Sequence, residues 1–333
     1  MTDLERVVAT LDPARRVAVV THKLPDGDTT GSALGLVHLL RRAGKDAVAV
    51  GPDPILPPYR FLPGAAEHRA LATPTEAGPQ DVVVTVDCGD PDRAFGLAGL
   101  RAMAPVVVNV DHHVTNRRWG DVNWIEPDRA AVGEMGVMLA DALGVPLDRD
   151  AALCFYVSLA TDTEGFRFGA QDPRILELAV RLVRLGLDPD ALSRALFERQ
   201  SLASLRLLGW ALSHVRTLPS GRVAWVALSR ATLRRLGAAR WESEGIVNHI
   251  RALDGVRLAV FLREEGKGQV KISLRSRPPW EAAPVAQRLG GGGHRDSAGA
   301  NLAADLDGAL HQTLRAVEEL YGEAVPWTAL STS

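Results

Sequence analysis

Short runs of β-branched and other apolar residues alternate with helical patterns along the first half of the chain. The first run covers residues 16–21, and apolar positions spaced as on one helix face follow over residues 29–44. Further apolar runs cover residues 46–50, 81–86 and 105–110. Continuous apolar strands that alternate with helices are typical of a parallel sheet covered by helices. The pattern therefore predicts an α/β domain.

The second half of the chain has a different pattern. Residues 130–214 are mostly helical in character, with breaks at glycine and proline. Strand patterns return over residues 221–229, 255–264 and 269–276, and helical patterns cover residues 230–236, 245–253 and 281–289. This mixture predicts a second, smaller α+β domain. We expect a first domain over residues 1–190, a helical linker over residues 191–215 and a second domain over residues 216–333.

Composition supports two globular domains and excludes several classes of protein. The chain has 333 residues, of which 46% are hydrophobic, which is enough for sizeable cores. Its 38 basic and 40 acidic residues argue against a protein that coats polyanions through bulk positive charge. Only two cysteines occur, and neither a signal peptide nor a membrane-length apolar run is evident. We expect a cytoplasmic protein with no membrane partner.

Acidic residues and histidines gather where three of the expected strands end. These segments carry His22, Asp26 and Asp28, then Asp87, and then Asp111, His112 and His113. Ligands of open α/β sheets bind beyond the carboxyl ends of the strands, so the three segments can converge there. Carboxylates so close together would repel one another without a cation. The pattern favours a metal site, to which Asp162 at the end of an apolar helical segment could contribute.

Each of these residues also has a purely structural interpretation. Asp26 and Asp28 suit a turn and a helix cap before Thr29. Asp87 could cap the next turn, and Asp162 could end a helix without any chemical role. His113 could be a hydrogen-bonded, half-buried histidine. The metal interpretation rests on their joint occurrence.

Together the motifs resemble those of the DHH/DHHA1 phosphoesterase superfamily over almost the whole chain. They occur in the family's order: His22, Pro25, Asp26, Asp28, Gly31 and Ser32, then Asp87, then Asp111, His112, His113 and Asn116, then Asp162, and finally Gly291, Gly292, Gly293, His294, Ala298 and Gly299. Length and layout are most similar to the nano-RNase/pAp-phosphatase branch. The resemblance implies an N-terminal DHH domain with a mainly parallel sheet, and a smaller α+β DHHA1 domain across a cleft.

The resemblance also implies two divalent cations. One would be held by His22, Asp26 and Asp87, and the other by Asp28, Asp87, His112 and Asp162, so that Asp87 bridges both. Mn²⁺ is expected, and Mg²⁺ or Co²⁺ also suits these ligand types. Such a pair of metals hydrolyses phosphate esters. Asp87, Asp111 and His113 would be the catalytic residues, with Asp111 orienting a neighbouring histidine and His113 contacting the phosphoryl group or the leaving group.

Substrate-binding residues are expected mainly in the second domain. Arginine presents a fork of donors to a terminal phosphate, and glycines let backbone amides approach one closely. The expected residues are Asn116, Arg275, Ser276, Arg277, Gly291, Gly292, Gly293 and His294. Without the family resemblance, the glycines would also fit a flexible linker.

The leading hypothesis is a hydrolase that releases 5′-mononucleotides from short RNA or single-stranded DNA and dephosphorylates 3′-phosphoadenosine 5′-phosphate (pAp) to AMP. Alternatives are hydrolysis of cyclic or linear dinucleotides and a RecJ-like single-strand exonuclease. A family II pyrophosphatase would lack the glycine-histidine loop, and a nucleotide-binding regulator would be expected to lack some ligands. The sequence leaves open whether the chain forms a homodimer.

Overall fold

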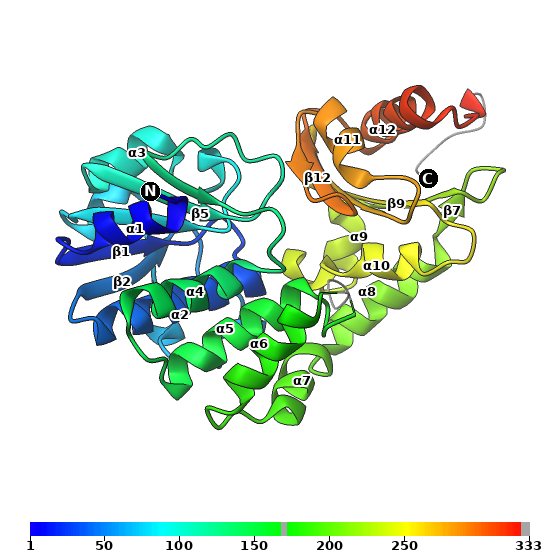
Figure 1. The fold of residues 1–333 in the computed structure, drawn as a ribbon. Helices are drawn as coiled ribbons and strands as arrows, with labels where there is room; N and C mark the ends of the chain where they lie inside the picture. The colour runs from blue at the N-terminus through cyan, green and yellow to red at the C-terminus, as the bar shows by residue number, and fades with distance from the viewer. Residues whose placement is uncertain (168–171, 328–333) are drawn as a thin grey trace. The chain divides into compact units, whose positions relative to one another are not determined.

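The computed structural model describes residues 1–167 and 172–327 (Figure 1). The chain forms two compact units, the first spanning Met1–Arg199 and the second beginning at Gln200. Each unit contains its own sheet and its own hydrophobic core.

The first unit is built on a six-stranded sheet in which all neighbouring strands are parallel. Its strands are β1 (Arg16–Val20), β2 (Asp46–Gly51), β3 (Arg69–Ala70), β4 (Val82–Val86), β5 (Val106–Asp111) and β6 (Val122–Ile125). Their order across the sheet is β3-β2-β1-β4-β5-β6. The chain therefore extends the sheet in one direction from β1 to β3 and in the other from β4 to β6, and the direction reverses between β1 and β4.

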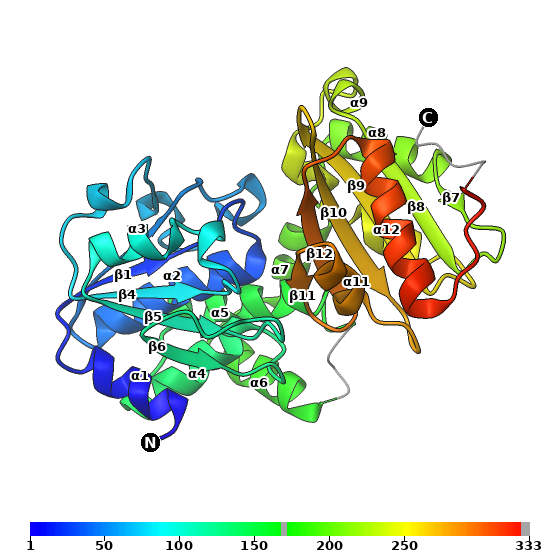
Figure 2. The ribbon, with the colours of Figure 1, turned by 90° about the horizontal axis from the view of Figure 1, so that it is seen from above.

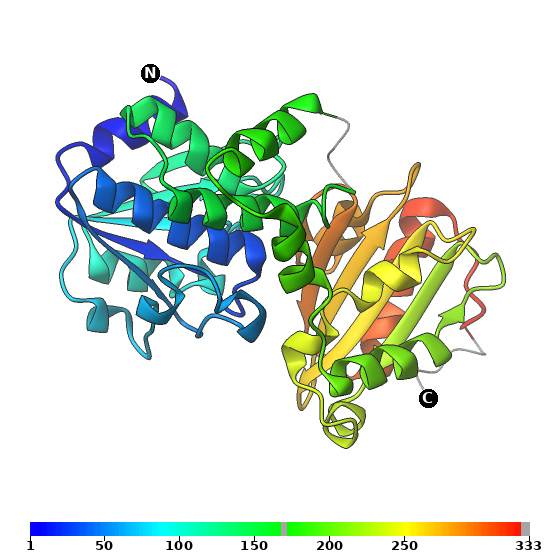
Figure 3. The ribbon, with the colours of Figure 1, turned by 90° about the horizontal axis from the view of Figure 1, so that it is seen from below.

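Helices cover both faces of this sheet (Figures 1 and 3). The α-helices of the first unit are α1 (Asp3–Leu11), α2 (Gly27–Arg42), α3 (Gly96–Met103), α4 (Val132–Leu143), α5 (Arg149–Asp162), α6 (Pro173–Val183) and α7 (Pro189–Phe197). Short 3₁₀ helices lie at η1 (Pro57–Tyr59), η2 (Ala65–Glu67), η3 (Pro74–Ala77) and η4 (Pro91–Arg93). Helices α2, α4 and α5 pack into the larger core on one face, and α3 packs into a smaller core on the other.

Helices α2 and α5 pack against each other very closely. A Cβ atom on Gly31 would lie 2.4 Å from the carbonyl oxygen of Cys154 and 2.8 Å from the amide nitrogen of Ser158. A Cβ atom on Gly27 would likewise lie 2.4 Å from the side chain of Thr161. Because the earlier glycine of α2 faces the later residue of α5, the two helices run antiparallel. Glycine at position 31 lets the backbones approach. The close packing brings the start of α2 and the end of α5 to the same edge of the sheet.

The second unit is built on a mixed six-stranded sheet. Its strands are β7 (Arg216–Thr217), β8 (Val223–Leu228), β9 (Leu258–Gly266), β10 (Gln269–Ser276), β11 (Gly292–Gly293) and β12 (Ser297–Leu302). Their order is β11-β12-β10-β9-β8-β7. Only the β8–β9 pair is parallel within this sheet.

Helices also cover both faces of the second sheet (Figures 1 and 2). They are α8 (Leu202–Ser213), α9 (Arg230–Arg235), α10 (Ile246–Arg251), α11 (Ala282–Arg288) and α12 (Leu306–Tyr321), with the 3₁₀ helix η5 (Arg240–Ser243). Helices α11 and α12 pack on one face, and α8, α9 and α10 pack on the other.

The predicted fold class is confirmed: a parallel sheet covered by helices, followed by an α+β unit. Of the helices in the expected linker region, α7 packs into the first unit through Leu192 and α8 into the second through Leu207. Helices α1 and α12 are additional to the expected elements. A membrane-spanning helix would have to be longer and more apolar than any found in the described part of the chain.

Candidate metal centre

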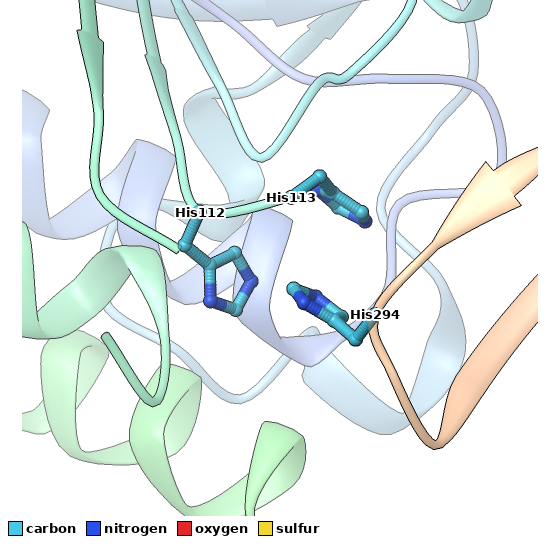
Figure 4. Close-up of side chains that lie close together, drawn as sticks. All are labelled: His112, His113 and His294. Carbon is cyan, nitrogen blue, oxygen red and sulfur yellow. The ribbon is translucent and has the colours of Figure 1, made fainter. Parts of the chain in front are cut away.

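The candidate site lies where the order of strands in the first sheet reverses direction. His22 follows β1, and Asp87 follows the adjacent strand β4. Asp111 ends the next strand, β5, and is followed by His112 and His113 (Figure 4). In open α/β sheets such a reversal leaves a crevice beyond the carboxyl ends of the strands. The fold therefore brings acidic and histidine residues from the ends of three neighbouring strands to one point.

Asp87 is the central residue of this cluster. Its carboxylate is buried, and its φ of 52° lies in the left-handed region, which is costly for a residue with a side chain. Asp87 Oδ2 lies 3.5 Å from His22 Nε2, and Oδ1 lies 3.7 Å from His112 Nε2 and 3.5 Å from His113 Nδ1. The strained backbone at Asp87 thus places its carboxylate between the imidazole rings of three histidines.

A first group of candidate metal ligands consists of His22, Asp26 and Asp87, whose nitrogen and oxygen atoms all lie within 4.8 Å of one another. Asp26 caps helix α2, because its Oδ1 accepts a hydrogen bond from the amide of Thr29 at 3.0 Å. Its other oxygen, Oδ2, lies 3.9 Å from His22 Nε2. The cap interpretation of Asp26 is therefore correct, and it leaves one oxygen facing the imidazole.

The contacts of His22 fix which ring nitrogen faces the acids. Nδ1 donates a hydrogen bond to the backbone carbonyl of Lys23 at 2.9 Å, and Nε2 accepts one from Arg93 Nη2 at 2.9 Å. Thr29 Oγ1 lies 2.7 Å from the same Nε2 atom and donates to Asp87 Oδ2 at 2.6 Å. Lone pairs of nitrogen and oxygen thus converge on one point, as the ligands of a cation do.

A second group of candidate metal ligands consists of Asp28, Asp87 and His112, whose nitrogen and oxygen atoms again lie within 4.8 Å of one another. His112 Nε2 lies 3.4 Å from Asp28 Oδ2 and 3.6 Å from Asp162 Oδ2. Asp162 is the last residue of α5, and the packing of α5 on α2 brings it to the cluster. Asp87 belongs to both groups.

Asp28 is buried and held by donors from two other helices. Oδ1 accepts hydrogen bonds from Ser32 Oγ at 2.9 Å and from Ser158 Oγ at 2.5 Å. Oδ2 accepts one at 3.0 Å from the amide of Val132, the first residue of α4. Asp28 therefore caps α4 from a distant part of the sequence, where the positive end of that helix favours a carboxylate.

The His112 ring is oriented by the segment before α4. Nδ1 donates to the backbone carbonyl of Arg129 at 2.9 Å, so Nε2 is the nitrogen that faces the carboxylates. The Arg129 side chain is itself held between Glu126 and Glu134, with hydrogen bonds of 2.6 Å and 2.9 Å. This pair of acids stabilises the loop that positions both His112 and, through Val132, Asp28.

Asp111 and His113 form a third interaction beside the two groups. His113 Nδ1 donates to Asp111 Oδ1 at 2.7 Å, and Asn116 Nδ2 donates to Asp111 Oδ2 at 2.6 Å. Asp111 is fully buried, so Asn116 and His113 satisfy its two oxygens. Asp87, Asp111 and His113 also meet the geometric criterion for a metal-binding trio. The structure therefore supports the expectation that Asp111 orients a histidine.

The charges of this cluster shift the protonation of its members. Burial opposes ionisation of Asp87, but the adjacent histidines outweigh it and hold the pKa of Asp87 well below its usual range. Burial and the nearby charge of Asp87 raise the pKa of Asp28 well above that range, and burial raises the pKa of Asp162 to about 6. The surrounding carboxylates raise the pKa values of His112 and His113 despite burial. The metal-free site is thus partly neutralised by protons that a cation would displace.

The other predicted substrate residues lie in the second unit. Arg275 lies on β10 on the face opposite the core residues Ile272 and Leu274, and Ser276 ends that strand in a buried position. Arg277 follows it and is exposed. His294, labelled in Figure 4, follows β11, and its amide donates to the carbonyl of Ser297 at 2.7 Å.

The glycine segment before His294 is an ordered edge of the second sheet. Gly292 and Gly293 pair with Gly299 and Ala298, so the segment is not the flexible linker considered from sequence. A Cβ atom on Gly291 would lie 2.1 Å from the carbonyl oxygen of Gly299. The amide of Gly291 already donates to Ala286. The close approach of β12 therefore explains by itself why position 291 is glycine.

Several residues of the site were not identified from the sequence. Thr29, Arg93, Arg129 and Ser158 all contact predicted ligands. Thr29 is adjacent to Asp28 in the sequence, and this position beside a candidate ligand could have indicated that it belongs to the site. Arg93 and Ser158 lie 71 and 130 positions from their partners His22 and Asp28, and their short-range sequence context carries no signal.

Comparison with known proteins agrees with the fold. Residues 16–159 match the DHH family, N-terminal domain, and residues 227–323 match the DHHA1 domain. The chain is 36% identical over 305 residues to the bifunctional oligoribonuclease and PAP phosphatase NrnA of Thermus thermophilus, covering 91% of this chain and 89% of that protein. The chain therefore belongs to the DHH family of phosphoesterases. Within that family it falls in the predicted NrnA-like branch, which this similarity confirms.

Two solved structures share the fold. An exopolyphosphatase-related protein of Bacteroides fragilis superposes with a TM-score of 0.83 at 24% identity, covering 95% of this chain and 96% of that chain. RecJ of Thermus thermophilus in complex with Mn²⁺ has a TM-score of 0.53 at 18% identity, covering 95% of this chain and 55% of RecJ. Both similarities concern the fold.

Proposed function

We propose that the first unit binds two divalent cations that share Asp87. His22, Asp26 and Asp87 would hold one, and Asp28, Asp87, His112 and Asp162 the other. The support is geometric: two groups of ligand atoms, each within 4.8 Å, have the Asp87 carboxylate in common. Hydrogen bonds on Nδ1 of His22 and His112 turn the Nε2 atoms toward the carboxylates, as outer partners do for metal-binding histidines.

The donor atoms fit the proposed cations. Imidazole nitrogens and carboxylate oxygens together suit Mn²⁺, and the same set accepts Mg²⁺ or Co²⁺. Four carboxylates, those of Asp26, Asp28, Asp87 and Asp162, would balance the charge of two dications. The related RecJ structure in complex with Mn²⁺ makes Mn²⁺ the first choice for experiments.

The proposed reaction is hydrolysis of a phosphate ester. A pair of divalent cations held by these residues would supply an activated water molecule and would stabilise the charge on the phosphoryl oxygens. His113, whose pKa is raised by Asp111, carries a ring proton that it can donate to the leaving oxygen. Asp111 keeps that ring in place through Nδ1, and Asn116 keeps Asp111 in place.

Short oligonucleotides and pAp are the proposed substrates. The Thermus thermophilus relative is named an oligoribonuclease and PAP phosphatase, and it is similar over nine-tenths of the chain. In the second unit, Arg275, Ser276, Arg277 and the segment Gly291–His294 would bind the terminal phosphate or nucleotide. We expect the glycines to shape this surface more than to donate hydrogen bonds, because the amide of Gly291 is already used.

A substrate panel tests the proposed function. The protein would be assayed with Mn²⁺ on pAp, on two- to ten-residue oligonucleotides, on cyclic dinucleotides, on pyrophosphate and on long duplex DNA. We expect hydrolysis of pAp and of the shortest oligomers, and no hydrolysis by Asp87→Asn. Faster cleavage of cyclic dinucleotides, pyrophosphate or long duplexes would replace the proposed substrates, and near-normal activity of Asp87→Asn would exclude the proposed metal site.

A further inference from the structure

Arg93 occupies an unexpected position in the candidate metal centre. Its Nη2 atom donates a hydrogen bond to His22 Nε2 at 2.9 Å, although carboxylates surround that nitrogen. Among the described residues, the Arg93 guanidinium forms no ion pair with a carboxylate. The guanidinium that donates to this ring nitrogen therefore occupies the position, next to several carboxylates, where a divalent cation would bind.

The bond from Arg93 and a bond to a metal ion exclude each other. Because the Lys23 carbonyl accepts the proton of Nδ1, Nε2 has a single lone pair in the plane of the ring. Arg93 uses that lone pair in the metal-free arrangement. A divalent cation at His22 must therefore displace the guanidinium.

The backbone keeps Arg93 beside the site after such a displacement. Its carbonyl accepts a hydrogen bond from the amide of Lys23 at 2.7 Å, and its amide donates to Asp90 at 3.0 Å. The Lys23 side chain also bonds to the carbonyl of Asp92 at 3.0 Å. These bonds hold the two loops together without the Arg93 side chain, so the side chain is not required for that purpose.

From these contacts we propose that Arg93 is a substrate-binding residue with two alternative partners. In the metal-free protein its guanidinium bonds to His22 Nε2, and in the metal-loaded protein it binds the phosphoryl oxygens of the substrate. This role rests on the proposed metal-dependent hydrolysis. An anionic substrate has to approach several carboxylates, and a guanidinium at the site presents two parallel donors to phosphate oxygens.

The proposal predicts opposite effects of one substitution. Arg93→Ala removes a competitor for His22 Nε2, so Mn²⁺ should bind about three- to tenfold more tightly, as expected for the loss of one competing hydrogen bond. The same substitution removes a phosphate ligand, so the KM for pAp at saturating Mn²⁺ should rise about tenfold or more. A merely structural role would weaken both metal binding and substrate binding.

Arg101→Ala is the matched control. Arg101 is an exposed arginine of the same unit, and its partner is Asp121. Both variants remove one positive charge. Mn²⁺ binding would be measured by calorimetry, without any substrate. In Arg101→Ala, the Kd for Mn²⁺ and the KM for pAp should both stay within about twofold of the wild-type values.

AMP binding to the Mn²⁺-loaded protein gives a readout that does not depend on turnover. We expect Arg93→Ala to bind AMP about tenfold more weakly than the wild type and than Arg101→Ala. Unchanged or weaker Mn²⁺ binding in Arg93→Ala would overturn the competition at His22, and unchanged AMP binding would overturn the phosphate contact. If the wild-type protein hydrolysed none of the panel substrates, the proposed function would fail, while both binding results would still decide the role of Arg93.

Discussion

His22 Nε2 lies 3.5 Å from Asp87 Oδ2, although the two residues are 65 positions apart in the chain. They meet because β1 and β4 are neighbours at the point where the strand order reverses. His112 approaches the other oxygen of Asp87 from β5, which is the next strand. The topology of the sheet is therefore what makes Asp87 common to both groups of candidate ligands.

The hydrogen bond between Asp111 and His113 predicts a pH effect. Asp111→Asn removes the negative charge that raises the pKa of His113, so that pKa should fall. If protonated His113 donates to the leaving group, activity is lost as the pH rises through that pKa. The alkaline limb of the kcat/KM profile for pAp should therefore move to lower pH.

Asn116→Ala is the control for this effect. It removes the second hydrogen bond of Asp111 but leaves the carboxylate charge in place. Because that charge is what raises the pKa of His113, we expect the alkaline limb to stay near its wild-type pH. An alkaline limb at the same pH in wild type and Asp111→Asn would show that His113 is not the proton donor.

Metal binding should strengthen as the pH rises through about 6. In the metal-free protein, burial raises the pKa of Asp162 from 3.8 to about 6. The folded state therefore holds this proton more tightly than the unfolded state, and the contribution of Asp162 to stability falls as the pH rises between these values. Mn²⁺ needs the ionised carboxylate, and His112, with its raised pKa, must also lose its extra proton.

The increase in Tm caused by a fixed concentration of Mn²⁺ reports this linkage. We expect a clearly larger increase at pH 7.5 than at pH 5.5, and a weaker pH dependence in Asp162→Asn. Equal increases at the two pH values in the wild type would argue against Asp162 as a ligand.

Gly31→Ala tests the packing of the two helices that carry Asp28 and Asp162, and Gly209→Ala is its control. In Gly31→Ala the new methyl group would overlap the backbone of α5, which should lower the free energy of unfolding by about 1–3 kcal/mol. Gly209 lies in α8, where an added Cβ atom would meet nothing within 4 Å, so Gly209→Ala should raise it by about 0.5–1 kcal/mol. Urea denaturation measures both. A neutral Gly31→Ala would show that the helices can separate without cost.

Arg275→Ala tests the proposed role of the second unit. Losing a guanidinium–phosphate interaction should raise the KM for pAp about ten- to a hundredfold. The Mn²⁺ stoichiometry should remain two, because Arg275 is not among the proposed ligands. Bis-p-nitrophenyl phosphate, a generic ester, is the control substrate and should be much less affected. Equal losses on both substrates would mean that Arg275 contributes to the catalytic centre itself.

The sequence was sufficient to predict which acidic and histidine residues gather at this point, because most of them follow strongly patterned elements. The valine-rich runs of β1, β4 and β5 mark buried parallel strands, and Asp87 and His112 follow them directly. The pattern singles out Asp162 as a candidate, but its assignment to one group of ligands needed the family resemblance, because its place in the cluster depends on helix packing. Gly31 allows that packing, and no local periodicity reveals it.

The residues that position the candidate ligands could not be predicted from the sequence. Ser158 bonds to Asp28 from another helix, and the Arg129 carbonyl bonds to His112 through the backbone, for which residue type carries no information. Short elements were missed for a related reason. Strand β6 is only four residues long and mostly half-buried, so its pattern is weak, whereas the strand that precedes it is nearly continuous valine.

Anomalous scattering from crystals of the protein soaked in Mn²⁺ tests most directly whether two cations share Asp87. We expect two peaks in the first unit, one contacted by His22, Asp26 and Asp87 and the other by Asp28, Asp87, His112 and Asp162, at a separation of about 3.5–4 Å. Both ions should contact the carboxylate of Asp87. A single peak, or a peak held by Asp111 and His113 in place of either site, would contradict the proposed centre.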